Sequence, residues 1–257
     1  MAMKTNMTEE KLQKAKSENA VVYKVMAALL LLCGTLTGLR FLRSYYATIG
    51  GFDKIYPMTI WIAVAGLAVF VVSALLKLAV KQKLVQAVAP WFMTIGIMVC
   101  ATGFFMRRYW TDGFPSLYFL CCAVLLQYVI FLLYRWEFFL FSLSTAVTGF
   151  LFFQFSGGVA WNMLTIVLLV VEAVVLLGTF LLAHAAAGNK GLLVFGKKRI
   201  QLLPAKSNPV LIYLVDALWL VCVLVALLLG GLVAYYCMFA AIAVEFIAAV
   251  YYTFQLN

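Results

Sequence analysis

Residues 159–182 read VAWNMLTIVLLVVEAVVLLGTFLL, a stretch in which Glu172 is the only charged side chain. A helix needs roughly 20 apolar residues to cross the hydrocarbon core of a bilayer. This stretch is long enough, and it follows the polar triplet Ser156, Gly157 and Gly158, which suits a break between two spans. The pattern therefore predicts a membrane-spanning helix.

Seven further apolar runs have the same character. Paired cations, aromatic residues, glycines and an Asn-Pro turn separate them. The eight predicted spans cover residues 21–39, 57–76, 84–105, 114–134, 138–155, 159–182, 210–229 and 232–254. Because backbone groups in lipid must be satisfied within each segment, we expect an all-α fold, a polytopic transmembrane helical bundle of about eight spans with minimal extramembrane structure.

The composition supports this fold class. The chain has 257 residues, of which 67% are hydrophobic and 11% charged, against about a quarter charged in ordinary soluble domains. Its mean hydropathy is +1.08. We expect residues 1–20 to form a cytoplasmic segment with a short surface helix, and residues 21–257 to form a single transmembrane domain. Little chain remains for a soluble catalytic domain.

The cations predict the orientation of the chain. With eight spans, one side of the membrane carries 14 of the 19 Lys and Arg residues. The other side carries Arg40, Arg43, Lys54, Arg107 and Arg108. Because cytoplasmic loops retain cations, we expect a multi-pass protein of the cell membrane with both termini in the cytoplasm. The same distribution accounts for the net charge of +10 without a nucleic-acid partner.

The predicted cytoplasmic loop 183–209 contains the sequence GNKGLLVFGKKRIQLLPAKSNP at residues 188–209. Its cations lie between two apolar blocks. This pattern favours an interfacial hairpin or a short amphipathic helix, in which Lys197, Lys198 and Arg199 contact anionic headgroups or a partner subunit. An ordinary positively charged loop is the alternative.

Polar side chains inside the predicted spans are the candidate functional residues. Glu172, Asp216 and Glu245 lie in the last three spans, where an ionised side chain costs on the order of 2.5 to 3.5 kcal/mol at the centre. Glu172, Glu245 and Gln127 are equally far from the start of their spans, which places them in one layer about 20 Å deep. Asp216 is expected to lie slightly shallower.

Helical spacing indicates which way these side chains point. Thr165, Glu172 and Thr179 recur every seven residues and form a polar stripe on the sixth span. Glu245 shares a face with Ala241 and Ala249, small residues that allow helices to approach closely. We therefore expect these carboxyls to face protein rather than lipid.

The predicted spans contain no cation in mid-span that could neutralise these acids, so Glu172 and Glu245 are expected to be largely protonated at rest. Such groups can exchange protons or bind a cation, which makes a small-solute or ion permease-like protein the leading hypothesis. One alternative is that they only fix helix packing through hydrogen bonds. Another is a non-catalytic membrane subunit or scaffold that docks a partner or anionic lipid through the basic loop.

The remaining motifs do not point to a catalytic or metal-binding site. The six cysteines lie in apolar runs without CxxC spacing, and His184 is a single imidazole near a span end. No metalloprotease, hydrolase or phosphate-loop motif is present, so we expect no enzyme, no metal site and no cofactor. Gly34 and Gly38 form the pattern GTLTG, which is typical of a helix packing contact and in some proteins of an oligomer interface.

Overall fold

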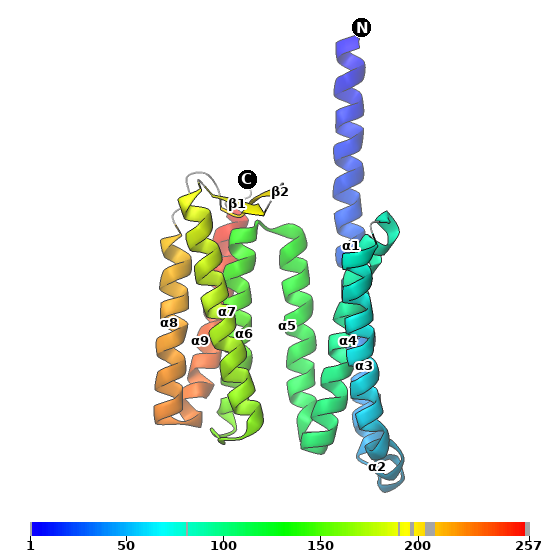
Figure 1. The fold of residues 1–257 in the computed structure, drawn as a ribbon, viewed down its shortest axis with the longest axis vertical. Coiled ribbons are helices and arrows are strands. Elements are labelled where there is room, and N and C mark those ends of the chain that lie inside the picture. Colours follow the sequence, from blue (N-terminus) through cyan, green and yellow to red (C-terminus); the bar gives the residue numbers. More distant parts are fainter. Residues whose placement is uncertain (1, 81, 190, 196–197, 204–208, 255–257) are drawn as a thin grey trace. The chain divides into compact units, whose positions relative to one another are not determined.

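The computed structural model describes residues 2–80, 82–189, 191–195, 198–203 and 209–254. It is a helical protein with one short β-hairpin (Figure 1). The chain divides into two compact units, one made of residues 29–122 and the other of residues 1–28 and 123–257. The protein is a multi-pass transmembrane protein, because the described residues include seven apolar helical stretches that are long enough to cross a membrane.

These seven stretches contain eight long helices. The stretch Val88–Leu133 has 46 residues, which as one helix would measure about 69 Å, more than twice the hydrocarbon core. It consists of the greater part of α4 (Lys83–Tyr109), the short turn η2 (Trp110–Gly113) and α5 (Phe114–Leu133). The expectation of about eight spans in an all-α fold is thus confirmed.

The unit of residues 29–122 contains α4, η2, the beginning of α5 and the segments that precede them from residue 29 on. The last part of α1 (Ala2–Tyr46) belongs to it, and so do α2 (Ile49–Ile55), η1 (Tyr56–Met58) and α3 (Thr59–Ala79). Thr48 caps α2 by accepting a 3.1 Å hydrogen bond from the Gly51 backbone N–H. The helix α1 continues without a break from Ala2, so no boundary separates the expected surface helix from the first span.

Helices α3 and α4 pack with their backbones in contact. A β-carbon on Gly66 would lie 2.3 Å from the backbone nitrogen of Cys100, and one on Gly103 would lie 2.6 Å from that of Ala63. By contrast, nothing lies within 4 Å of a β-carbon built on Gly34 or Gly38. The close helix contact in this unit is therefore made by the glycines of α3 and α4, not by the GTLTG pattern of α1.

The unit that contains residues 123–257 holds four long helices beside the second half of α5. They are α6 (Trp136–Ser156), α7 (Met163–Gly188), α8 (Val210–Leu229) and α9 (Gly231–Phe254). Helix α6 contacts α7, α8 and α9 (Figure 1). Its most apolar window is 61% buried, whereas those of the other stretches are at most 28% buried. Helix α6 is thus the centre of this unit.

The ends of these helices follow local sequence signals. Asn162 caps α7 by accepting a 3.0 Å hydrogen bond from the Thr165 backbone N–H. Helix α8 ends at Gly230, whose φ of 87° lies in the left-handed region that glycine adopts without strain. The expected tight turn between the last two spans is therefore present.

A β-hairpin joins α7 to α8. Its strands β1 (Leu192–Phe195) and β2 (Lys198–Gln201) pair antiparallel, with Leu193 opposite Ile200. Leu193 and Leu203 are buried against Leu140 of α6 and Ile212 of α8. Of the two forms expected for this loop, the structure thus shows the hairpin, which lies at the end of the bundle where α6 begins (Figure 1).

Candidate functional site: buried carboxyls around helix α6

Four hydroxyl side chains line helix α6 and are buried. Ser142, Ser144, Thr145 and Thr148 are each at most 3% exposed. Three of them also donate to carbonyls one turn earlier on the same helix, as Thr148 does to Ser144 over 2.8 Å. Because this local bond satisfies the hydroxyl within its own segment, such residues are tolerated in an apolar helix. A hydroxyl has a single proton, so it can donate either to this carbonyl or to an acceptor on a neighbouring helix, while its oxygen can accept a further hydrogen bond.

Helix α7 contributes the most buried acid. Glu172 is 3% exposed, and its Oε1 accepts a hydrogen bond of 2.5 Å from the Thr148 hydroxyl. Asp216 of α8 lies close enough to interact with Glu172 electrostatically. The two carboxyls therefore form a pair at the contact between α6, α7 and α8.

Asp216 of α8 is held by helix α7, and a second contact nearby joins α8 to α6. Its Oδ2 accepts a 2.8 Å hydrogen bond from the Thr179 hydroxyl of α7. One turn further along α8, the Trp219 indole N–H donates to the Thr145 hydroxyl over 3.2 Å. These contacts fix the orientation of α8 against α6 and α7.

Glu245 belongs to a second group. The Ser142 hydroxyl donates to its Oε1, and Ser142 in turn accepts a 2.6 Å hydrogen bond from the side-chain amide of Gln127 on α5. The same amide donates to the Ser142 carbonyl over 2.9 Å. Helices α5, α6 and α9 are thus joined through a single serine.

The unpaired oxygen atoms are the most informative feature of the site. One side-chain oxygen of each of four residues is buried and has no hydrogen-bond partner among the described residues. These atoms are Gln127 Oε1, Glu172 Oε2, Asp216 Oδ1 and Glu245 Oε2. A buried polar atom without a partner costs about 1 to 3 kcal/mol, so such atoms require an explanation.

The structure brings the sequence-predicted residues together in two groups rather than in one layer. Ser142 and Thr148, which hold Glu245 and Glu172, are six residues apart on α6 and are therefore offset by about 9 Å along it. Thr179 joins the first group through Asp216. Thr165 joins neither, because its hydroxyl donates to the Ala160 carbonyl beside the cap of α7.

The carboxyls face protein, as their spacing predicted. Glu172 and Asp216 are buried, and Thr165 and Thr179 of the polar stripe are also at most 6% exposed. Ala241, one turn before Glu245 on α9, is 2% exposed. None of the three acids accepts a hydrogen bond from a lysine or arginine in the described part of the chain.

One buried acid was missed by the sequence analysis. Glu137, in the first turn of α6, is 8% exposed and accepts a 3.1 Å hydrogen bond from the Tyr252 hydroxyl of α9. It stands one residue before the predicted span 138–155, where an acid is usually taken for a boundary residue. The complementary signal is Tyr252, one heptad after Glu245 on the same face of α9.

The structure describes only part of the basic loop. Lys198 and Arg199 lie in β2, while Lys197 lies outside the described residues. The side chains of Lys198 and Arg199 are not described, so their expected contacts with headgroups or a partner stay predictions. His184 stacks on Phe180 with ring centres 6.1 Å apart. Within the described ranges, no group of three or more His, Cys, Asp or Glu is arranged to hold a metal ion.

Comparison of the chain with known protein families, with characterised proteins and with solved structures gives no match. In an apolar environment an ionised carboxyl needs a compensating charge, and no lysine or arginine among the described residues forms a hydrogen bond with these acids. A bound proton or a bound cation can supply it, and the unpaired oxygens mark where either would bind.

Proposed function

We propose that this membrane protein is permease-like and moves a proton or a small monovalent cation through the Glu172–Asp216 pair. The observation that supports this is the half-satisfied state of both carboxyls. Each has one oxygen fixed by a hydroxyl, while Glu172 Oε2 and Asp216 Oδ1 are buried without a partner. A packing role alone would favour carboxyls with both oxygens satisfied.

The arrangement fits reversible binding. Thr148 and Thr179 orient the carboxyls without adding a positive charge, so a proton or a cation can bind and leave without displacing a salt bridge. Ionisable groups facing the interior of a helical bundle commonly mark ion pathways and proton relays. We further propose that the protein lies in the cell membrane with both termini in the cytoplasm, in line with its uneven distribution of cations.

The test is proton flux into vesicles. Purified protein is reconstituted into liposomes that contain the pH-sensitive dye pyranine, and a potassium diffusion potential is imposed with valinomycin. We expect wild-type protein to acidify the lumen faster than protein-free vesicles do, and Glu172→Gln to reduce the rate to that background. A sodium- or potassium-sensitive dye in vesicles without valinomycin, with a gradient of the tested cation imposed, tests the cation alternative.

The matched control is Glu137→Gln. Glu137 is also a buried acid of this unit, but its carboxyl pairs with Tyr252, and neither of its oxygens is among the buried unpaired atoms. We expect this variant to keep wild-type flux. Equal fluxes of protons and of both cations in wild-type and Glu172→Gln vesicles would contradict the proposal.

A further inference from the structure

A groove lies in the other unit, between the end of α1 and the beginning of α5. Its volume is about 720 Å³. Seven residues line it, namely Leu36, Arg40, Arg43, Ser44, Ala47, Tyr118 and Cys122. All of them belong to the unit of residues 29–122, and none belongs to the carboxyl groups described above.

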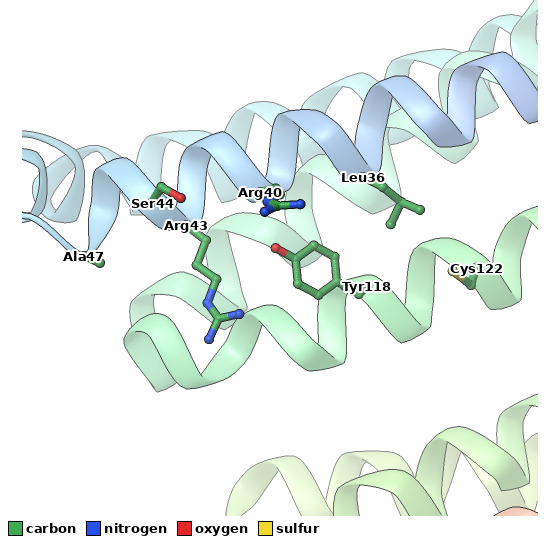
Figure 2. A pocket seen from close by; sticks show the side chains of 7 residues that line it. All are labelled: Leu36, Arg40, Arg43, Ser44, Ala47, Tyr118 and Cys122. Carbon is green, nitrogen blue, oxygen red and sulfur yellow. The ribbon is translucent and has the colours of Figure 1, made fainter.

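The groove is cationic at one end. Arg40 and Arg43 are one turn apart on α1 and share a face. Figure 2 shows Arg40 beside α1, the Arg43 side chain extending from α1 toward α5, and the Tyr118 hydroxyl pointing toward Arg40. Neither guanidinium group forms an ion pair with a carboxylate among the described residues. Two positive charges and a hydroxyl are therefore available to a ligand.

The other end of the groove is apolar. Leu36 lies one turn deeper in α1 than Arg40, and Cys122 lies one turn deeper in α5 than Tyr118. Arg43 is three residues from the end of α1, which is about 4.5 Å, and we expect a guanidinium group so close to the end of a spanning helix to reach the headgroups. The polar-to-apolar order along the groove matches that of a phospholipid.

We propose that this groove binds one anionic phospholipid, with its phosphate on Arg40 and Arg43 and an acyl chain along Leu36 and Cys122. Guanidinium groups bind phosphate through paired, charge-assisted hydrogen bonds. Two of them in one site favour a lipid whose net charge is negative, because a choline headgroup would bring its own cation to the same place. Tyr118 adds a hydroxyl donor to the phosphate.

The test is a thermal-shift titration of the full-length protein in a mild detergent. The probes are dioctanoyl phosphatidylglycerol, dioctanoyl phosphatidylcholine as the neutral lipid and inorganic phosphate as the headgroup anion alone. We expect phosphatidylglycerol to raise the melting temperature and the other two to leave it unchanged. Each arginine near an anionic headgroup contributes about 1 kcal/mol of binding free energy. We therefore expect the double variant Arg40→Gln/Arg43→Gln to bind phosphatidylglycerol about 30-fold more weakly.

Two further variants separate the lipid from other occupants. Arg108→Gln removes an arginine of the same unit that faces the Tyr109 ring and does not line the groove, and we expect it to bind like wild type. Cys122→Phe fills the apolar end without changing charge, and we expect it to weaken binding at least as much as the double variant. An equal shift for all four proteins overturns the proposal. So does a shift with inorganic phosphate, or a wild-type dimer that the double variant dissociates.

Discussion

At the scale of single residues, each buried acid depends on a hydroxyl from another helix. Thr148 holds Glu172, Thr179 holds Asp216 and Ser142 holds Glu245. In water these hydroxyls would be replaceable, because solvent could satisfy the carboxyls. In an apolar interior the loss of one hydroxyl leaves a second oxygen of the same carboxyl without a donor, and the cost falls on the folded state.

We therefore predict that Thr148→Val, which keeps the shape of the side chain, lowers the free energy of unfolding by about 1 kcal/mol. Unfolding of the detergent-solubilised protein by sodium dodecyl sulfate measures this difference. Thr102→Val is the control, because its hydroxyl donates to the Met98 carbonyl of its own helix. Equal stability of both variants would show that the bond between Thr148 and Glu172 contributes nothing.

At the scale of helices, the contact between α3 and α4 depends on the absence of side chains. A β-carbon on Gly96 would lie 2.7 Å from the backbone nitrogen of Phe70, and backbone atoms cannot move aside as the end of a flexible side chain can. Small residues allow this close approach in membranes, where van der Waals packing is a main source of helix association. Adding a single methyl group at Gly96 would therefore force the two helices apart.

We predict that Gly96→Ala destabilises the protein by about 1 to 3 kcal/mol, the usual cost of overpacking. Gly38→Ala should be neutral or slightly stabilising, because nothing lies within 4 Å of its added β-carbon and alanine is the better helix former. Thermal unfolding followed by circular dichroism measures both. The reverse order would show that the GTLTG face, not the face of α4, makes the important contact.

The spans were predictable from the sequence because apolar length is a property of each segment alone. The helix contacts were not, because GTLTG in α1 and Gly96 in α4 look alike until their neighbours are known. Likewise, Glu172 stands out in an apolar run, whereas its partner Thr148 looks like any self-satisfied hydroxyl. The groove could not be foreseen, since Arg43 and Tyr118 are far apart in the chain.

At the scale of the whole molecule, the chain separates two kinds of chemistry. The three carboxyls with a buried unpaired oxygen lie in the unit that contains residues 123–257, while the groove with Arg40 and Arg43 lies in the unit of residues 29–122. The proposed ion site and the proposed lipid site can therefore be removed one at a time. Changes in one unit should leave the measurements on the other unaffected if the two act independently.

The proposed topology of eight crossings would place both ends of the chain on one side, and the cations predict that this side is the cytoplasm. We predict that a reporter active only in the cytoplasm works when it is fused after residue 257 or inserted after Asn189. The same reporter inserted after Gly157 should be inactive, while a periplasmic phosphatase there should be active. A phosphatase that is active after residue 257 would contradict this orientation.

The central place of α6 has a consequence for biosynthesis. This helix has the lowest mean hydropathy of the seven stretches, and its hydroxyls are covered by helices that the ribosome makes later. When α6 first emerges, those partners do not yet exist, and lipid is a poor substitute for them. Three of the four hydroxyls can meanwhile donate to carbonyls of α6 itself, so the helix can enter the bilayer alone and exchange these bonds for contacts with α7, α8 and α9 as those helices follow.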